Sequence, residues 1–385
     1  MRNAVNRLLL SITLSFLLVS LSGQVSIRIF AGSRPESVIF NVSSGGYFFN
    51  SFEGDTLKLV EGDLVLIARL NGKLAVKTRH SKAFLADSII FFSIPESSFS
   101  VRLDGANTTK QVYSGDLKIK NDLNTIVMIS NCDRDSYLAG VVSAEGGSGR
   151  SREYYKTQAV IARTYMYKYN GKHLHDGYNL CDNTHCQAFN GIVADTEINN
   201  AVKATMDIVI MAQDSTLIIS AFHSNCGGET ASSEDVWLTG VPYLKKITDP
   251  YCRTSKNASW VKTIPLPVWI ETIGKLTHGE QKLTPADAGL IQETRIPYYK
   301  AGNVNIAFSD IRNELGLRSA FFSVVPSGEN IILEGRGYGH GVGLCQEGAM
   351  NMALKGFSYS DIIKFYYTDI IIGAVSASKP DAVVR

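Results

Sequence analysis

The pattern of apolar and polar positions divides the chain into two parts of different character. Between residues 24 and about 125, short runs rich in Val, Ile and Phe are separated by clusters of Gly, Asn, Asp and Ser. Such runs predict β-strands joined by turns. They read VSIRIF, TLKLV, DLVLIARL, KLAVKT and SIIFFSI. We therefore predict a β-rich accessory domain over residues 24–125, without a catalytic constellation of its own.

After about residue 130 the spacing of apolar residues becomes helical. The segment 152–169 (REYYKTQAVIARTYMYKY) predicts a helix with one buried stripe. Its stripe consists of Tyr155, Ala159, Ala162 and Met166. Further helices are predicted over 194–206, QEGAMNMALKG and SDIIKFYY, and strands in TLIISAFHS and NIILEGRGYGH. The predicted fold class is α+β, with mixed sheets and a few helices in residues 126–385, preceded by the β-rich N-terminal domain.

The first 23 residues have the order of a secretory signal peptide. Two arginines precede LLLSITLSFLLVSLSG, an apolar run too short for a comfortable membrane span, and small residues follow it. The alternative is an uncleaved N-terminal anchor. No cysteine follows the run, so a lipoprotein anchor is unsupported. We expect an exported protein of the periplasm or cell envelope.

Composition narrows the classes of function. The chain has 385 residues, a formal net charge of +2, 45% hydrophobic residues and 19% charged residues. This is enough apolar material for two or three ordinary domains, and the small net charge gives no case for nucleic-acid binding. Six cysteines are too few for a disulfide scaffold in so long a chain, although export permits a Cys226–Cys252 disulfide.

Glu145 ends the apolar stretch Tyr137-Leu-Ala-Gly-Val-Val-Ser-Ala-Glu. Apolar surroundings raise the pKa of a carboxyl group, and a raised pKa suits a general acid near neutral pH. The alternative is a carboxylate that caps a helix start or complements its dipole, which is the commoner role for a single Glu.

A short loop gathers four possible metal ligands, His175, Cys181, His185 and Cys186. Thiolate and imidazole groups suit tetrahedral zinc, and a closed site with four protein ligands would be structural. His173 could take the place of His175. The alternative is a Cys181–Cys186 disulfide with histidines at the surface.

Two glycine-rich turns carry polar side chains. Ser224 follows a predicted strand and precedes Gly227-Gly228, and His340 lies within GRGYGHGVG. Such turns let the backbone approach a ligand closely, and we predict that His340 lines a substrate site. A plain structural turn is the alternative around Ser224. The turn GRGYGHGVG superficially resembles a dinucleotide-binding fingerprint, but it lacks the αβ unit and the acidic residue about 20 positions further on that such a site requires.

Tyr243 and Lys245 are two residues apart on an extended segment, PYLKK, and therefore face the same side. An aromatic face can stack on a sugar, and a lysine can pair with a carboxylate. The alternative is a solvated strand face.

Together, in this order, these motifs resemble the stage II sporulation protein D family (SpoIID/LytB) of peptidoglycan enzymes. The resemblance runs from about Tyr137 to Tyr367, and the β-rich region lies outside it. It rests on YLAGVVSAE, KTQAVIARTY, DNTHCQAFNG, SNCGGETASSEDVW, PYLKKITDPYC and GRGYGHGVGLCQEGA followed by SYSDIIKFYY.

The resemblance implies lytic transglycosylase activity on glycan strands, with Glu145 as the acid. It places the family's arginine on Arg163, its tyrosine and lysine on Tyr243 and Lys245, and its zinc site on the four loop residues above. The predicted substrate-contacting residues are Arg163, Gln187, Ser224, Tyr243, Lys245, His340 and Gln346.

The sequence departs from the family just after Glu145, where Gly-Gly-Ser-Gly-Arg replaces Met-Pro and a tryptophan-containing stretch. One alternative is therefore a non-catalytic protein that binds peptidoglycan and stimulates a cell-wall amidase. A zinc hydrolase is another, and it would need an open coordination position. The expected partners are peptidoglycan glycan strands and, under the first alternative, a cell-wall amidase.

Overall fold

The computed structural model describes residues 23–50, 56–79, 81–104, 111–237, 239–279, 283–284 and 287–375. The predicted signal peptide, apart from its last residue, lies outside these described residues. The chain divides into two compact units. Unit 1 contains the described residues of 23–148 and 166–206, and unit 2 contains those of 149–165 and 207–375. This division differs from the predicted boundary at 125/126, where one continuous strand crosses.

Unit 1 is built on two β-sheets. The first has the order β13 (Leu180–Cys181), β1 (Gln24–Ile29), β12 (Thr125–Asp133), β11 (Asp116–Asp122), β8 (Ser88–Ser93), β3 (Gly46–Asn50) and β4 (Thr56–Val60). The second has the order β10 (Val112–Ser114), β9 (Ser98–Leu103), β2 (Ser37–Ser44), β5 (Leu64–Leu70), β6 (Lys73–Thr78) and β7 (Phe84–Ala86). These strands confirm the β-rich character predicted for residues 24–125.

Aromatic side chains join the two sheets of unit 1. Burial alternates along β2, as expected for a strand with one face in a core. Phe40 of β2 stacks on Phe91 of β8, with ring centroids 4.0 Å apart, and Phe99 and Tyr47 complete the cluster. All four rings are fully buried. The sheets therefore pack face to face around an aromatic core.

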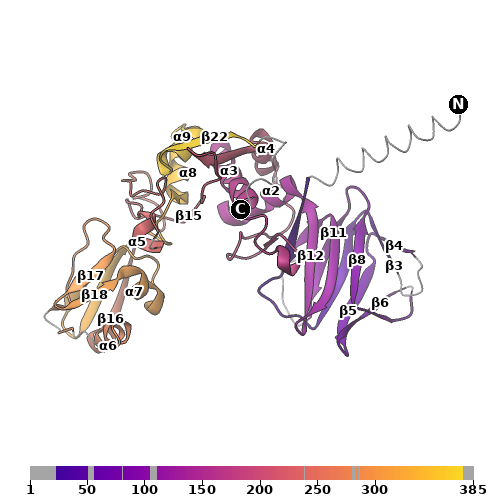
Figure 1. The fold of residues 1–385 in the computed structure, drawn as a ribbon, viewed down its shortest axis with the longest axis horizontal. Coiled ribbons are helices and arrows are strands. Elements are labelled where there is room, and N and C mark those ends of the chain that lie inside the picture. The colour runs from indigo at the N-terminus through magenta and orange to yellow at the C-terminus, as the bar shows by residue number, and fades with distance from the viewer. Residues whose placement is uncertain are drawn as a thin grey trace. The chain divides into compact units, whose positions relative to one another are not determined.

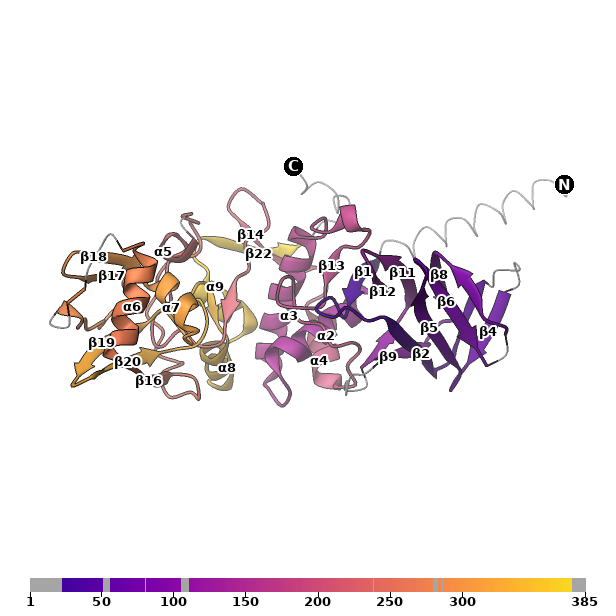
Figure 2. The same cartoon turned by 90° about the horizontal axis from the view of Figure 1, so that it is seen from below.

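Helix α2 (Arg134–Gly146) follows β12 directly, because the Asp133 side chain accepts the N–H groups of Asp135 and Ser136 and caps the helix. It packs against α4 (Thr196–Ala204) within unit 1 (Figure 2). The loop that precedes α4 contains a short 3-10 turn, η2 (Leu174–Asp176).

Helix α3 (Arg152–Lys168) confirms the predicted helical segment. The residues of its predicted stripe are all buried, namely Tyr155, Ala159, Ala162 and Met166. The glycines between α2 and α3 break the helix, with Gly147 at a φ of 72° and Gly149 at 68°.

Unit 2 combines small sheets with helices (Figure 1). Its sheets are β14 (Ile208–Ala212) with β22 (Ile370–Ala374), β16 (Ser259–Pro265) with β20 (Asn330–Arg336) and β19 (Phe322–Ser327), and β17 (Tyr298–Ala301) with β18 (Val304–Ala307). Its further helices are α5 (Ser233–Trp237), α6 (Leu266–Leu276), α7 (Phe308–Leu315), α8 (Gln346–Leu354) and α9 (Tyr359–Tyr366). Trp269 and Tyr299 lie at the centre of one hydrophobic core.

A parallel pair of very short strands joins the two glycine-rich turns of unit 2. Strand β15 (Phe222–His223) pairs with β21 (Leu344–Cys345), which places His223 opposite Cys345. The predicted strand TLIISAFHS is therefore confined to Phe222–His223, although other residues of this segment make isolated backbone bonds. Segments about 120 residues apart thus meet side by side.

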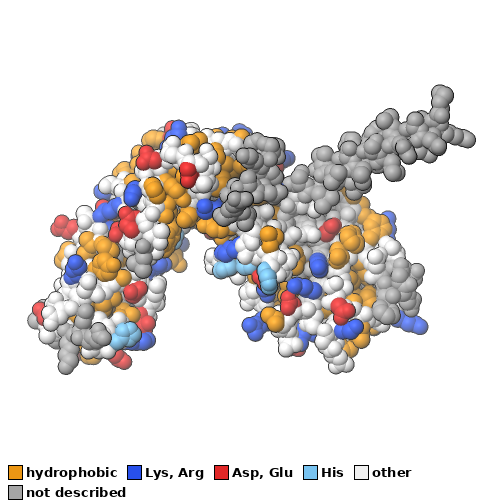
Figure 3. Space-filling view, in the orientation of Figure 1, with side chains coloured by type: hydrophobic (Ala, Val, Ile, Leu, Met, Phe, Trp, Pro, Cys, Tyr) orange, Lys and Arg blue, Asp and Glu red, His pale blue; other side chains and the backbone are white. Residues whose placement is uncertain are grey.

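The α+β fold class is confirmed by this combination of sheets and helices. Among the described residues, no helix has the length and hydropathy that crossing a bilayer requires. On the face shown in Figure 3, basic and acidic side chains are interspersed in each unit.

Candidate functional site

Glu145 lies in the last turn of α2, not at the start of a helix. The cap at the N-terminus of α2 is Asp133, so the alternative of a helix-start carboxylate does not apply. At a helix C-terminus the exposed carbonyl groups disfavour a negative charge. The position of Glu145 therefore adds to the cost of ionising its side chain.

The Glu145 carboxyl group is partly buried and positioned by a backbone amide. Burial raises the pKa of Glu145, and the N–H of Ala188, which donates to Oε1 at 2.9 Å, opposes this shift. Ala188 had no signal in the sequence that linked it to Glu145. The outcome is a carboxyl group with a raised pKa and a fixed orientation, which are the properties of a general acid.

The segment that carries Ala188 packs tightly on α2. A glycine at position 140 makes this possible, because a Cβ there would lie 2.5 Å from both a Phe189 ring carbon and the Gly191 carbonyl oxygen. Tyr137 of α2 donates to Oε1 of Gln187 at 3.3 Å. Gln187 is only 2% exposed and supports this packing, and its role as a substrate contact stays a prediction.

We predict that Gly140→Ala destabilises the fold by about 1–3 kcal/mol, because the added methyl group meets backbone on the opposite segment. The same change should shift the Ala188 amide away from Glu145. Chemical denaturation monitored by circular dichroism measures the stability. Gly32→Ala is the matched control, because no atom lies within 4 Å of a Cβ at that position. Equal stability of the two variants would contradict the prediction.

Four side chains of the loop before Ala188 lie close enough to bind one metal ion. They are His173, Cys181, His185 and Cys186, and their ligand atoms all lie within 4.8 Å of one another. The histidine is thus His173, whereas the sequence analysis favoured His175. His175 lies in η2, is exposed and is not part of this cluster.

The distances within this cluster fit a thiolate–imidazole site. His173 Nε2 is 3.4 Å from Cys186 Sγ, and His185 Nδ1 is 3.7 Å from Cys181 Sγ. The Cys186 thiol, followed by His185, lowers the pKa of Cys181 to about 4, so Cys181 is poised as a thiolate. Asp176 Oδ2 lies 3.3 Å from the other ring nitrogen of His173, an arrangement that orients metal-binding histidines.

The β-rich region holds this loop in place. Cys181 lies in β13, which pairs in parallel with β1. The Asp182 carboxylate accepts the N–H groups of Phe30 and Ala31, and Ile192 N donates to Val112 O at 2.8 Å. The N-terminal sheets therefore form the support for the loop, a role that no sequence motif indicated.

In unit 2, two of the predicted substrate residues are buried. Arg163 is 2% exposed, and its Nη1 donates to the carbonyl of Ile208 at 3.3 Å. Tyr243 is 9% exposed, and its hydroxyl oxygen accepts the N–H of Ile219 at 2.9 Å. These contacts hold both side chains in place within unit 2, and their role as substrate contacts stays a prediction.

Lys245 is the exposed member of the predicted set. Its side chain is 47% exposed, and Nζ lies 3.4 Å from the Glu234 carboxylate. An exposed pair of this kind is weak and exchanges readily for another carboxylate. The prediction that Lys245 can pair with a substrate carboxylate is compatible with this geometry.

His340 is partly buried between two rings, Trp237 at 5.6 Å and His223 at 5.5 Å between centroids. Its Nδ1 accepts the N–H of Val342 at 3.0 Å, and the ring also has a hydrogen bond with the Phe222 backbone. Burial lowers the pKa of His340 to about 4, so the ring is neutral at pH 7. Trp237 is 38% exposed and offers an accessible aromatic surface beside it.

Ser224 and the start of α8 meet in a polar network. The Glu347 carboxylate accepts Nδ2–H groups from Asn225 and Asn257, both at 2.6 Å, and Asn257 also donates to Ser224 Oγ at 3.3 Å. The neighbouring Gln346 is 9% exposed. Glu347 and both asparagines were not singled out from the sequence, because the β15–β21 pairing brings Asn225 and Glu347 together and Asn257 comes from a third segment of the chain.

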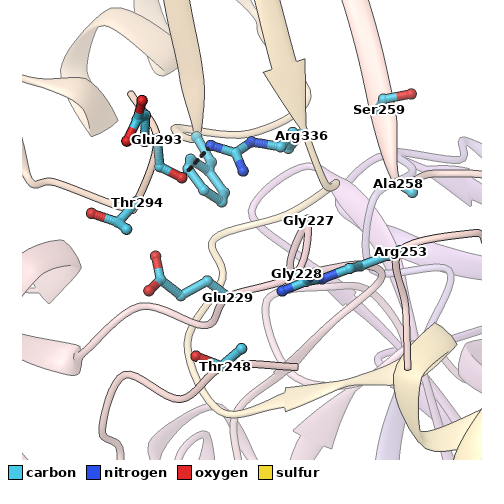
Figure 4. Close-up of a pocket in the computed structure, with 11 residues that line it drawn as sticks. Gly227, Gly228, Glu229, Thr248, Arg253, Ala258, Ser259, Glu293, Thr294 and Arg336 are labelled. Atoms are coloured by element: carbon cyan, nitrogen blue, oxygen red, sulfur yellow. Dashed lines mark hydrogen bonds between the residues drawn. The ribbon is translucent and has the colours of Figure 1, made fainter. Parts of the chain in front are cut away.

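A pocket of about 420 Å³ opens beside the Gly227-Gly228 turn (Figure 4). Arg253 and Arg336 reach into it, and Glu229 and Glu293 lie on its opposite side. The Arg336 guanidinium is fixed by the carbonyl of Glu293 at 2.8 Å and by the ring of Phe321 at 3.8 Å. This pocket can bind a polar group that carries a carboxylate.

The comparisons with known proteins agree with these motifs. Residues 122–211, which contain Glu145 and the loop with His173, Cys181, His185 and Cys186, match the SpoIID family, described as stage II sporulation protein. The chain is 29% identical over 269 residues to stage II sporulation protein D of Bacillus subtilis (strain 168), covering 65% of this chain and 77% of that protein. It is 28% identical over 267 residues to the Bacillus amyloliquefaciens protein of the same name, covering 63% and 75%.

A further relative is the amidase enhancer of Bacillus subtilis (strain 168), 28% identical over 283 residues that cover 60% of this chain and 39% of the enhancer. The resemblance indicated by the motifs is thereby confirmed. Residues 122–211 match the SpoIID family model, within a chain that is similar to stage II sporulation protein D over about two thirds of its length.

Proposed function

We propose that this protein is a lytic transglycosylase that cleaves peptidoglycan glycan strands beside N-acetylmuramic acid, with Glu145 as its catalytic carboxyl group. The observation that supports it most is the setting of Glu145. Its carboxyl group has a raised pKa because of burial, lies at a helix C-terminus and is oriented by the Ala188 amide.

One carboxyl group suffices for this reaction. Glu145 donates its proton to the glycosidic oxygen, and the bond from that oxygen to C1 of the muramic sugar breaks. The resulting carboxylate takes the proton from the 6-hydroxyl of the same sugar as O6 bonds to C1. This gives a 1,6-anhydro end and restores the acid, and proximity favours the internal hydroxyl over water.

Hydrolytic glycosidases instead use two carboxyl groups. In unit 1, Asp182 also has a pKa raised by burial. However, its oxygens accept the backbone N–H groups of Phe30 and Ala31, so Asp182 serves to anchor the loop. The described surroundings of Glu145 therefore favour anhydro-forming cleavage over hydrolysis.

Zinc fits the cluster of His173, Cys181, His185 and Cys186, and we propose that these residues hold one structural ion. When bound, zinc would supply cross-linking of the loop and no reactive water, since four protein ligands close its coordination. The loop ends two residues before Ala188, whose amide orients Glu145. Loop order and the position of the acid are thereby coupled.

We assign the remaining substrate contacts to exposed groups of unit 2. Lys245 and the arginines of the 420 Å³ pocket suit carboxylates of peptidoglycan, and Trp237 suits the face of a sugar ring. The protein would act in the cell envelope after export. Peptidoglycan is thus its partner, and cell-wall remodelling its role.

Arg253→Gln tests the role of the 420 Å³ pocket and leaves Arg336, the arginine that donates to backbone carbonyl groups, in place. We expect peptidoglycan binding weakened a few-fold, by about 1 kcal/mol or less, because the charge is at a solvent-accessible wall. The melting temperature should not change, whereas Arg336→Gln should lower it, because Arg336 also holds the Gln292 and Glu293 carbonyl groups. Co-sedimentation with purified walls measures binding. Unchanged binding in Arg253→Gln would remove the pocket from the substrate site.

The competing function is a wall-binding protein without catalysis that stimulates an amidase. The similarity to an amidase enhancer and the glycine-rich sequence after Glu145 support it. Mass spectrometry of digests of intact and peptide-stripped glycan distinguishes the two. New 1,6-anhydro ends support the transglycosylase. Binding without such ends, together with faster release of stem peptides by an added amidase, supports the alternative.

A further inference from the structure

Unit 2 contains a second group of metal-binding side chains, far along the chain from the loop of unit 1. It consists of Cys226, Asp249, Cys252 and Cys345, all buried, with their ligand atoms within 4.8 Å of one another. We propose that this cluster is a second structural metal site, which binds zinc through three thiolates and one carboxylate.

The distances among these atoms are those of a tetrahedral site before small adjustments. At a zinc–sulfur distance of about 2.3 Å, two thiolate ligands lie about 3.8 Å apart. Cys226 Sγ is 3.3 Å from Cys252 Sγ and 3.2 Å from Asp249 Oδ2. Movements of a few tenths of an ångström would therefore admit the ion.

Backbone amides already surround the sulfur atoms. The N–H of Cys226 donates to Cys345 Sγ at 3.3 Å, that of Gly348 to the same sulfur at 3.4 Å, and that of Gly228 to Cys252 Sγ at 3.3 Å. Cys345 is also the N-cap of α8, where the helix dipole favours a thiolate. These donors stabilise negative sulfur, as the surroundings of metal-bound thiolates do.

The carboxylate is oriented in the same manner. Asp249 is fully buried, Oδ1 accepts the N–H of Tyr251 at 2.8 Å, and Oδ2 accepts the hydroxyl of Tyr366 at 2.9 Å while facing Cys226. A Cβ at position 348 would lie 2.4 Å from Asp249 Oδ2, so the glycine there permits the close approach. Such a buried carboxylate beside sulfur calls for a cation.

A bound zinc ion with three thiolates and one carboxylate leaves two negative charges, and a buried cation lies beside them. Arg295 is 8% exposed, and its Nη2 donates to the carbonyl of Cys226 at 3.0 Å. The rival arrangement is a Cys226–Cys252 disulfide. A disulfide would bond only Cys226 and Cys252. It would leave the Cys345 thiol and the buried Asp249 carboxylate beside a neutral disulfide in place of a metal cation.

The ion would tie together three segments, namely the turn after β15, the loop that contains Cys252 and the N-terminus of α8. The same turn and helix carry Ser224, Glu347 and one wall of the 420 Å³ pocket. The second site would thus hold the polar surface of unit 2 as the first holds the loop of unit 1, independently of any catalytic role for Glu145.

The test uses the full chain, exported through its own leader so that a disulfide has the chance to form. Cys181→Ser/Cys186→Ser removes the first cluster, and elemental analysis should still find about one zinc per chain. X-ray absorption should show a coordination shell of three sulfurs and one oxygen. Adding Cys345→Ser to this background should remove the ion, whereas adding Cys132→Ser, a buried cysteine outside both clusters, should not.

A folded double variant without metal would overturn the proposal, as would a Cys226–Cys252 disulfide in a non-reducing peptide map. If Cys345→Ser fails to fold, the metal content and absorption spectrum of the Cys181→Ser/Cys186→Ser protein still give the answer. The zinc content of that protein does not depend on whether it cleaves glycan, so failure of the two proposals can be told apart.

Discussion

Glu145→Gln should abolish the formation of 1,6-anhydro ends from purified glycan, with a loss of about 10²- to 10⁴-fold or more in rate. Glutamine has nearly the shape of glutamate and keeps an oxygen for the Ala188 amide, but it cannot donate a proton to the glycosidic oxygen. Binding to glycan should persist. Quantifying anhydro-muramyl products by mass spectrometry over time measures the effect.

The matched control is Glu197→Gln, an exposed glutamate in the first turn of α4 in the same unit. It should cut glycan at the parental rate. If Glu145→Gln cuts as fast as Glu197→Gln, Glu145 is not the acid, and the amidase-stimulating alternative or a different carboxyl group must be considered.

The raised pKa of Glu145 also fixes the sign of its effect on stability. Burial favours the protonated carboxyl group in the folded protein, so its favourable contribution is present at low pH and is lost as pH rises through the folded-state pKa. Glu145→Gln should therefore melt at the same or a higher temperature than the parent at neutral pH. A large drop in melting temperature would show that lost activity reflects unfolding.

The second large effect is expected for the metal-binding loop. Loss of a group that only hydrogen-bonds to a metal ligand weakens metal binding by roughly 10- to 100-fold. His173→Ala removes a ligand itself and should therefore weaken zinc binding by more than this. The reason is that His173 Nε2 faces Cys186, whereas His175 is exposed outside the cluster. Competition with a chromophoric chelator measures the affinity in the Cys345→Ser background, so that the two sites are not confused.

His175→Ala is the control and should bind zinc as the parent does. The zinc affinity of Asp176→Asn should lie between those of His173→Ala and His175→Ala, because the Asp176 carboxylate contacts His173 Nδ1 at 3.3 Å and is not itself a ligand in the cluster. The reverse order, with His175→Ala the weaker binder, would show that η2 rearranges around the metal. Absence of zinc together with a Cys181–Cys186 disulfide would disprove this site.

Much of the local structure followed from the sequence. Runs rich in Val, Ile and Phe between turn residues predicted strands such as β5 and β6, and apolar residues at helical spacing predicted α3. The strand expected from TLIISAFHS was wrong over most of its length. Leu217 and Ile218 of this segment are buried, but its backbone makes isolated hydrogen bonds, such as that from the Ile218 N–H to the Ile210 carbonyl, which periodicity cannot identify.

The residue types of the candidate sites were also evident, but their partners were not. Cys181, His185 and Cys186 were recognised from their spacing, whereas the choice of His173 over His175 depends on which way a 3-10 turn directs two side chains. Likewise, Arg163 was predicted as a ligand for a substrate carboxylate, and only the structure shows that it is buried and donates to the Ile208 carbonyl. Spacing predicted the apolar stripe that α3 buries, but not that the polar Arg163 beside this stripe is buried as well.

The sequence by itself determined the α+β class, the SpoIID motifs and the candidate acid, because these depend on local periodicity and on residue types in order. Only the tertiary structure decided that Glu145 lies in the last turn of a helix and accepts the Ala188 N–H, and that the β-rich region supports the loop that contains the candidate metal ligands. It alone gathered Cys226, Asp249, Cys252 and Cys345. The physical reason is that such contacts join segments up to about 150 residues apart, whose meeting is set by the packing of the whole domain and not by any local pattern.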